Sequence, residues 1–225
     1  MENPWEGLKK NKNGEYIAAC DKEKINELKT TLTGDYELKL GAMPAPYTGD
    51  PEKAVVYLLA LNPGYAPGDE ETTESHKNLF LKNLTHSKLT CPFTPFSQEL
   101  EGKGGELYWS KKLRPVIDQV GRDIVSRYVL SAEYFPYPSK RFVYSKKLNL
   151  PLESQKYTFS LIEKAIKDKK IIIVMRSEKL WFDAVPKLEG YAFMVSNNQN
   201  PIISPKNLGE DNFNKVINKL SRIKG

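Results

Sequence analysis

Residues 54–64 read AVVYLLALNPG, a continuous apolar run that stops abruptly at Pro63 and Gly64. An apolar run without polar alternation is typical of a central strand that is covered on both faces of its sheet. Proline followed by glycine is a strong turn signal, so the strand should end there. The sequence therefore predicts a buried central strand that ends in an Asn62-Pro63-Gly64 turn.

Helical and strand patterns alternate along the rest of the chain. Residues 21–32, DKEKINELKTTL, place apolar residues three or four apart behind a candidate cap at Asp21, which predicts an amphipathic surface helix. Further helices are expected within residues 111–127, 157–170, 178–188 and 210–223. Further strands are expected within residues 128–138, 171–177 and 191–197.

This alternation favours an α/β fold, a three-layer sandwich in which helices flank a central, mostly parallel sheet. The length suits one α/β domain about as well as two small domains, and residues 1–225 are interpreted as a single domain, with no repeat or linker in the pattern. In such sheets, ligands bind at the loops that follow the carboxyl ends of the strands. Functional residues are therefore expected in those loops.

Composition narrows the class of protein. No apolar stretch approaches the roughly 20 residues of a membrane span, and the start MENPWEGL lacks the apolar centre of a secretory signal, so we expect a cytoplasmic protein with no membrane partner. Two cysteines, Cys20 and Cys91, are too few for a four-cysteine site, and His76 and His86 do not supply the remainder, so no metal or cofactor is expected. The net charge of +6 favours a polyanionic partner without requiring one.

Residues 65–112 are polar and irregular apart from a short helical pattern and the aromatic cluster CPFTPF. A segment of this length without a clear element is unusual in a compact domain, which favours a functional role. The chain has no Gly-rich phosphate loop with Lys, no Gly-x-Ser-x-Gly turn and no paired His ligands. The sequence therefore gives no support to nucleotide triphosphatases or to hydrolases of those types.

Three strands end in unusual turns, LNPGYAPGD at 61–69, EYFPYPSK at 133–140 and NQNPIISPKN at 198–207. A strand that ends in Asn-Pro-Gly resembles the first active-site motif of the uracil-DNA glycosylase superfamily, in its mismatch-specific and single-strand-selective branches. The turn NPIISPKN is similar to the second motif of that superfamily, Asn-Pro-Ser, with a shifted Ser-Pro. The resemblance covers the order of elements from about Ala54 to Asn207 and implies a uracil-DNA glycosylase-like fold with DNA as partner.

The resemblance implies a role for each matching residue. Asn62 matches the residue that positions the attacking water, while Pro63 and Gly64 let the backbone approach the base and present amide donors. Asn200 matches the lead residue of the second motif, which stabilises the charge that develops on the base. The sequence departs from the most active branch, because it has no His in the second motif and no Asp directly after the first; Asp69 is a candidate carboxylate and equally a surface residue.

Base recognition would use aromatic faces and one polar side chain. Tyr65, Phe80, Phe93 and Phe96 are candidates to stack on a flipped base, and core packing is the alternative for each. The Asn that reads the base edge in the family would fall near the end of the 128–138 strand, where this sequence has Glu133. A carboxylate accepts hydrogen bonds from an amino group, which points to a base other than uracil.

Two loops are candidates for contacts with the DNA backbone. YPSKRFVYSKK, residues 137–147, combines hydroxyls, cations and rings suited to phosphates, or is a solvated basic loop. The loop after the last strand would hold a phosphate beside the lesion, or would only cap the final helix. The candidate residues are Tyr137, Ser139, Lys140, Arg141, Tyr144, Lys146 and Lys147 in the first loop and Ser204, Pro205, Lys206 and Asn207 in the second.

The sequence thus supports two functional hypotheses. The first is a DNA glycosylase-like hydrolase that flips uracil or another modified base into a pocket at Asn62 and Asn200 and hydrolyses its N-glycosidic bond without a cofactor. The second is a non-catalytic nucleic-acid or nucleotide binding protein on the same fold. Two features favour it: the second motif has no His, and Glu133 stands where the family has Asn. The base, the strand preference and the oligomeric state are not readable from the sequence.

Overall fold

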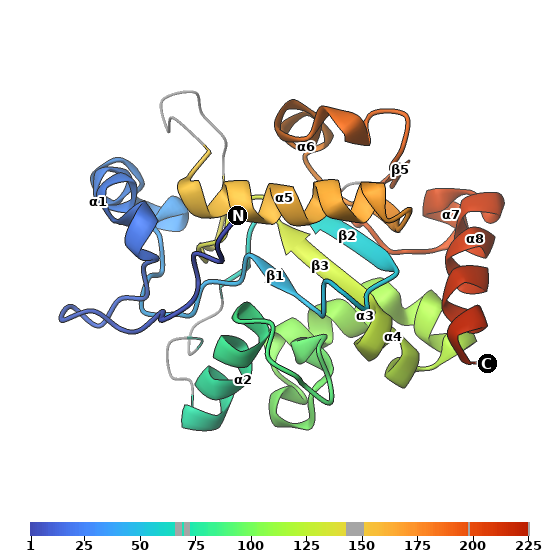
Figure 1. Ribbon diagram of the computed structural model, residues 1–225, viewed down its shortest axis with the longest axis horizontal. Coiled ribbons are helices and arrows are strands. Elements are labelled where there is room, and N and C mark those ends of the chain that lie inside the picture. Colours follow the sequence, from blue (N-terminus) through green and yellow to red (C-terminus); the bar gives the residue numbers. More distant parts are fainter. Residues whose placement is uncertain (66–68, 70–72, 143–150, 198, 225) are drawn as a thin grey trace.

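A computed structural model describes residues 1–65, 69, 73–142, 151–197 and 199–224. The fold is α/β, with a five-stranded mixed sheet in the order β1-β3-β2-β4-β5 (Figure 1). Strands β2 (Val56–Ala60), β3 (Val129–Glu133), β4 (Ile171–Val174) and β5 (Phe193–Met194) are parallel, and β1 (Tyr47–Thr48) pairs antiparallel with β3. The predicted mostly parallel sheet is confirmed, and the short edge strand β1 has no counterpart in the sequence prediction.

Strand β2 is central because it pairs with β3 on one side and β4 on the other. Its side chains alternate between the two faces of the sheet: Tyr57 and Leu59 join one buried cluster, and Val56 and Leu58 join the other. All four are at most 2% exposed. The unbroken apolar run of the sequence is therefore explained by burial on both faces.

Helices cover both faces of the sheet, so the predicted layers are present (Figure 1). On the face of Tyr57, the buried cluster includes residues of α1 (Lys22–Thr31), α5 (Glu153–Lys167) and α6 (Glu178–Ala184). On the face of Leu58, it includes residues of α3 (Gly104–Val120), α4 (Arg122–Tyr128) and α8 (Glu210–Ser221). The remaining α-helices are α2 (Glu74–Leu84) and α7 (Pro205–Leu208), and short 3₁₀ helices lie at Ala19–Asp21, Gly34–Tyr36, Thr94–Phe96, Gln98–Leu100, Pro186–Leu188 and Arg222–Lys224.

Asp21 does not cap the helix that follows it, contrary to the expectation from sequence. Its buried carboxylate instead accepts hydrogen bonds from the backbone N–H of Ser154 at 3.1 Å and from the Tyr137 hydroxyl at 2.8 Å. The Ser154 hydroxyl donates to the same carboxylate at 2.5 Å. Asp21 therefore binds the amino-terminal turn of α5 and ties the first residues of the chain to the loop after β3.

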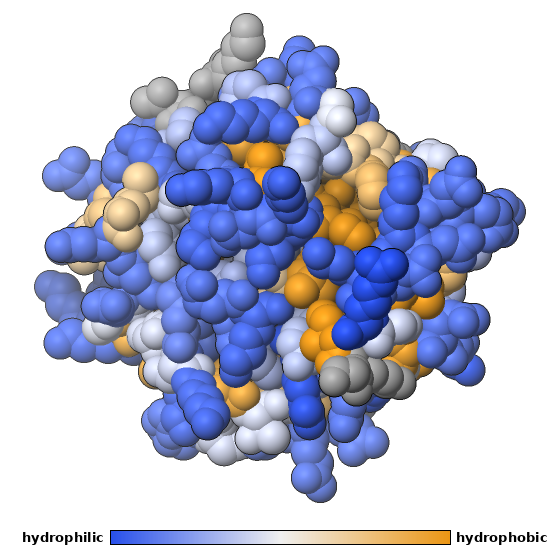
Figure 2. Space-filling view, turned by 45° about the vertical axis from the view of Figure 1, so that its right-hand side comes forward, coloured by the Kyte–Doolittle hydropathy of each residue, from blue (hydrophilic) through white to orange (hydrophobic). Residues whose placement is uncertain are grey.

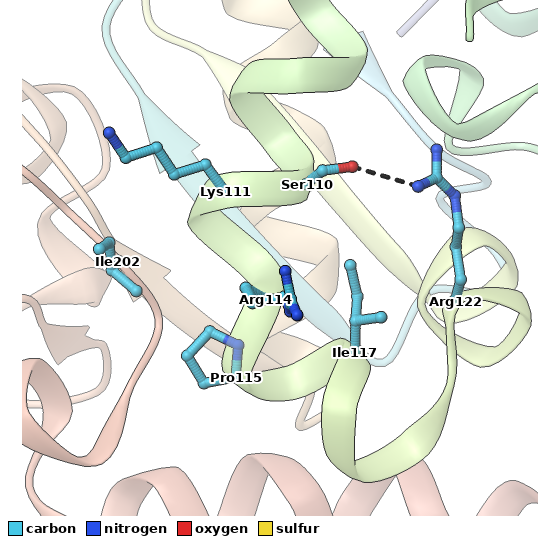
Figure 3. Close-up of a pocket in the computed structure, with 7 residues that line it drawn as sticks. All are labelled: Ser110, Lys111, Arg114, Pro115, Ile117, Arg122 and Ile202. Carbon is cyan, nitrogen blue, oxygen red and sulfur yellow. Dashed lines mark hydrogen bonds between the residues drawn. The ribbon is translucent and has the colours of Figure 1, made fainter. Parts of the chain in front are cut away.

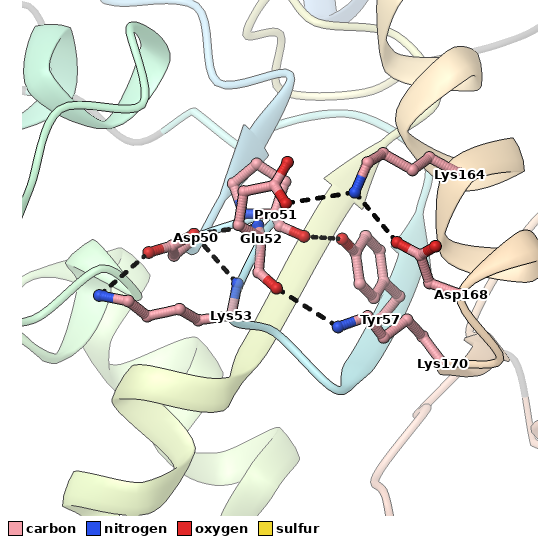
Figure 4. A network of polar contacts seen from close by, with 8 residues as sticks. All are labelled: Asp50, Pro51, Glu52, Lys53, Tyr57, Lys164, Asp168 and Lys170. Atoms are coloured by element: carbon pink, nitrogen blue, oxygen red, sulfur yellow. Dashed lines mark hydrogen bonds and ion pairs between the residues drawn. The ribbon is translucent and has the colours of Figure 1, made fainter.

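The amino ends of the strands are surrounded by a charged network (Figure 4). Lys164 lies 3.2 Å from Glu52 and 3.0 Å from Asp168, and the Tyr57 hydroxyl donates to the carbonyl oxygen of Pro51 at 2.7 Å. Burial raises the pKa of Tyr57, which keeps its hydroxyl a donor. Exposed ion pairs of this kind contribute little to stability, so the buried tyrosine is the stronger anchor of this edge.

The surface is predominantly hydrophilic on the face shown in Figure 2, with an apolar area visible between polar side chains. Among the described residues, the large hydrophobic side chains that are exposed are Met1, Tyr36, Leu107 and Tyr108. Leu107 and Tyr108 both belong to the first turns of α3. Within the same described part of the chain, no helix combines the length and the apolar character needed to cross a membrane.

Candidate functional site

A cavity of about 580 Å³ lies at the carboxyl ends of β2 and β3. Its walls come from the turn after β2, the end of β3, Arg176 just after β4, helix α2 and the amino-terminal turns of α3. The lining includes Asn62, Pro63, Gly64, Tyr65, Asp69, Phe80, Lys103, Tyr108, Glu133, Ser139, Lys140 and Arg176. Two of the three unusual turns predicted from sequence, 61–69 and 133–140, therefore contribute to one cavity together with the irregular 65–112 segment.

The Asn62 turn is held against the loop that follows β3. The backbone N–H groups of Phe135 and Ser139 donate to the carbonyl oxygens of Leu61 and Pro63 at 2.8 and 3.4 Å. The side-chain nitrogen of Asn62 donates to the Ser139 hydroxyl oxygen at 3.0 Å, and Ser139 in turn donates to the carbonyl of Arg141 at 2.8 Å. These bonds fix the orientation of the Asn62 amide, and no described residue donates to its side-chain oxygen.

Gly64 faces open space at the cavity. Its φ angle lies outside the left-handed region, and an added Cβ would meet no described atom within 4 Å. The backbone conformation therefore does not require glycine at this position. What glycine gives here is an exposed backbone beside the cavity, which a ligand can approach closely.

Glu133 is the last residue of β3, directly beside Ala60 of β2 in the register of the sheet. Its Oε2 atom is buried and has no hydrogen-bond partner among the described residues. Burial raises the pKa of Glu133 to about 8, although the positive charge of Arg176 acts in the opposite direction. At neutral pH the side chain is therefore mainly a neutral carboxyl with one donor and one acceptor, where the sequence had suggested a carboxylate.

Arg176 follows β4 and is the main residue of this cavity that the sequence did not single out. Its Nη2 donates to the backbone carbonyl of Gln199 at 3.3 Å, while its buried Nε has no partner in the described part of the chain. The next residue, Ser177, has a φ angle of 57°, which is left-handed backbone that a non-glycine residue rarely adopts. Sequence offered one signal, a lone cation at the end of the strand IIIVMRS.

Asn200 is exposed and does not line the cavity. Its side-chain oxygen accepts a hydrogen bond from the ammonium of Lys112 at 2.7 Å. The Lys112 ammonium also lies 5.2 Å from the centre of the Tyr108 ring, which does line the cavity. Asn200 and Asn62 are thus not brought together in one pocket. Among the described residues, Lys112 links the Asn200 side chain to the cavity region, and Arg176 binds the neighbouring Gln199.

The four aromatic candidates separate into two pairs. Tyr65 and Phe80 line the cavity, and both are partly buried. Phe93 and Phe96 pack against each other with ring centres 5.1 Å apart and belong to the core cluster on the α3 face. Only the first pair is placed to contact a ligand.

The first candidate DNA-binding loop divides in the same way. Tyr137 is fully buried and bonded to Asp21, so it cannot contact a phosphate backbone, and that expectation is wrong. Ser139 is buried but lines the cavity beside Asn62, whereas Lys140 is exposed at the cavity and pairs with Asp35 at 2.9 Å. Tyr144, Lys146 and Lys147 lie outside the described residues.

The second candidate loop is held together by hydrogen bonds from Asn207. The Asn207 side chain is buried and donates to the carbonyls of Asn200 and Ile202 at 3.3 and 2.8 Å. It therefore holds the turn together instead of facing a phosphate, which corrects its expected role. Ser204 and Pro205 are partly buried at the start of α7, and Lys206 is exposed.

A second pocket, of about 680 Å³, lies along the outer side of α3 (Figure 3). Its two arginines already have partners, because Arg114 pairs with Asp118 at 3.0 Å and Arg122 pairs with Glu106 at 2.8 Å. Figure 3 also shows Arg122 directed at the Ser110 hydroxyl, at 3.2 Å. This pocket holds none of the residues at the ends of β2, β3 or β4, so the cavity at Asn62 is the better candidate site.

No three His, Cys, Asp or Glu side chains are grouped as metal ligands in the ranges that the structure describes. Comparison of the chain with protein-family models, with curated proteins and with solved structures gives no match. What the site can do is therefore argued from its own residues.

Proposed function

We propose that this chain is a DNA glycosylase-like hydrolase on a uracil-DNA glycosylase-like fold, which excises uracil or another modified base by hydrolysing its N-glycosidic bond. One observation carries the proposal: a single cavity is lined by Asn62-Pro63-Gly64 together with Tyr65, Phe80 and Glu133. Its volume of about 580 Å³ is ample for a nucleobase flipped out of its stack.

Asn62 is suited to position a water molecule. Because its amide nitrogen donates to Ser139, its carbonyl oxygen is oriented away from that contact and can accept a hydrogen bond from water. Hydrolysis needs that water at C1′ of the sugar as the bond to the base breaks, so a fixed acceptor lowers the cost of ordering it. Ser139 acts through Asn62 and is a positioning residue.

Glu133 is suited to read the edge of a base. A neutral carboxyl donates one hydrogen bond and accepts another, so it matches a base edge that carries an acceptor next to a donor. Both the lactam edge of uracil or hypoxanthine and the amidine edge of a cytosine derivative have this pattern. Tyr65 and Phe80 line the same cavity and supply ring faces, on which stacking contributes about 1 to 3 kcal/mol per base.

The test is incubation of the purified protein with oligonucleotides that carry uracil, hypoxanthine or modified cytosines, followed by alkaline cleavage at abasic sites. Asn62→Ala should lower the single-turnover rate by roughly a hundredfold or more while DNA affinity and unfolding temperature stay near those of the parent protein. Asn13→Ala, at an exposed asparagine far along the chain from the cavity residues, is the matched control and should cleave normally. Equal activity of Asn62→Ala and the parent would exclude the proposed mechanism.

The second candidate function is recognition of a nucleic acid or nucleotide without cleavage. The exposed position of Asn200, whose side-chain oxygen is already occupied by Lys112, favours it. It predicts salt-dependent DNA binding with no abasic product on any of these substrates. Abasic sites that disappear in Asn62→Ala would exclude it.

A further inference from the structure

Arg176 brings a positive charge to the cavity that no described carboxylate neutralises. It lines the cavity with Glu133, and its charge affects the pKa of that carboxyl, yet the two groups form no ion pair. Each has a buried atom without a partner, Nε of Arg176 and Oε2 of Glu133. Buried polar atoms normally have hydrogen-bond partners, so two unpaired ones in one cavity lining leave room for a partner that the described protein does not supply.

The charges around Arg176 point to an anionic ligand. Glu133 is mainly neutral near pH 7, and the other cation nearby, Lys112, donates to Asn200. Burial, and after it the positive charge of Arg176, lower the pKa of Lys112, so these two cations lie close enough to repel each other. A partly buried cation is stabilised by a negative charge placed against it, and no described carboxylate forms an ion pair with Arg176.

The position of Arg176 is fixed before any ligand binds. Its Nη2 donates to the carbonyl of Gln199, and the left-handed backbone of Ser177 follows it directly. Non-glycine residues are held in that conformation only where the surrounding structure requires it, and such positions cluster at functional sites. The guanidinium is therefore held by one printed contact, that to Gln199, and its buried Nε is left without a partner among the described residues of the cavity lining.

We propose that Arg176 is a catalytic residue that binds the negative charge on the departing base, the role that the sequence suggested for Asn200. This inference rests on the proposed glycosylase function. The bond between C1′ and the base nitrogen breaks, and the base leaves with the electron pair as an anion. The oxygen of the water held by Asn62 forms the new bond to C1′, and the proton it releases neutralises the base. Arg176 donates hydrogen bonds throughout and keeps its own protons.

A phosphate of the DNA backbone is the other anion that Arg176 could hold. The cavity already has exposed cations suited to phosphates, Lys103 and Lys140. Arg176, in contrast, has its Nε buried and shares the cavity with Glu133, at the carboxyl ends of β4 and β3 on either side of β2. This depth favours the base over the backbone.

The first measurement is calorimetric binding of two free bases, at a pH where 5-nitrouracil is an anion and uracil is neutral. Arg176→Gln should weaken binding of 5-nitrouracil about tenfold or more and change uracil binding less than about twofold, because only the anion gains a charge-assisted hydrogen bond. Arg176→Lys keeps the charge, so its affinity for 5-nitrouracil should lie between those of the parent and Arg176→Gln. Arg127→Gln, on α4 and outside the cavity lining, removes the same charge elsewhere and should bind like the parent.

The second measurement is the single-turnover rate on oligonucleotides that carry uracil or 5-fluorouracil. Fluorine makes the base a better leaving group, so the rate loss in Arg176→Gln should be smaller for 5-fluorouracil than for uracil. A merely structural role would lower both rates equally, which would overturn the proposal. If Arg176→Gln does not fold, the same comparison is made with Arg176→Lys.

The two proposals fail in different ways. If the parent forms no abasic product, the glycosylase function is excluded. If Arg176→Gln then still loses 5-nitrouracil binding, the anion site at Arg176 is supported. Abasic product with unchanged rates in Arg176→Gln would keep the glycosylase and overturn the role of Arg176. A parent protein that does not bind the 5-nitrouracil anion would overturn the role of Arg176 as well. So would an Arg176→Gln variant that still binds the anion but whose DNA binding depends less on salt, because that result assigns Arg176 to a phosphate.

Discussion

Glu133 and Arg176 line one cavity from the ends of β3 and β4, and they do not form an ion pair. Strand β2 lies between the two strands that carry them, which keeps the carboxyl and the guanidinium apart. Burial raises the pKa of Glu133 more strongly than Arg176 lowers it. The result is a neutral acid and an uncompensated cation in the same site, a combination that suits a ligand better than it suits the folded protein alone.

Glu133 should make the stability of the protein depend on pH. Its pKa is about 8 in the folded state and near 4.5 when the chain is unfolded, so between these values the folded state binds the extra proton. Stability is therefore full below the lower value and falls as pH rises through the window, by about 1.4 kcal/mol per unit at most. Glu133→Gln removes the titration, so its free energy of unfolding should exceed that of the parent increasingly from about pH 5 to about pH 8.

Urea unfolding at several pH values in this range measures the effect. Glu189→Gln, at an exposed glutamate, is the matched control and should run parallel to the parent at each pH. A constant difference between Glu133→Gln and the parent across the range would show that Glu133 is ionised in the folded protein and would contradict its neutral state.

Gly64→Ala should separate function from folding. Because the φ angle of Gly64 is not left-handed and a Cβ meets no described atom, we expect the free energy of unfolding to change by less than about 0.5 kcal/mol. The same methyl group stands where a base must approach the backbone, so base binding and the excision rate should fall roughly tenfold or more. Paired unfolding and binding measurements check both parts, and an unchanged affinity would place the base elsewhere in the cavity.

The strands were readable from sequence because their apolar runs report burial directly. AVVYLLALNPG is the central strand and IIIV is β4, and the turn after each strand contributes to the cavity, as parallel topology requires. Asn62, Glu133 and Tyr65 reach that cavity because each lies at or just beyond a strand end.

Side-chain direction within long loops was not readable in the same way. Tyr137 is turned into the core by Asp21, a residue 116 positions away, and the side-chain oxygen of Asn200 is bound by Lys112, 88 positions away. Local patterns report neither contact, because the partners are distant in sequence. Arg176 was missed for a related reason: a single arginine after a strand has no periodic signal, and only the folded protein shows that its Nε is buried and that it lines the same cavity as Glu133.

The edge of the sheet that carries the cavity should be the one that binds DNA. Lys103 and Lys140 are exposed there, whereas Lys53 lies in the charged network at the amino ends of the strands (Figure 4). If DNA lies across the cavity, Lys103→Ala and Lys140→Ala should each lower the slope of log affinity against log salt by about 0.9, since each removes one phosphate contact. Lys53→Ala should leave the slope unchanged although it removes the same charge. Fluorescence anisotropy with one labelled duplex at several salt concentrations gives all three slopes, and an equal decrease in all three would show that the net charge of the protein, and not the cavity edge, determines where DNA binds.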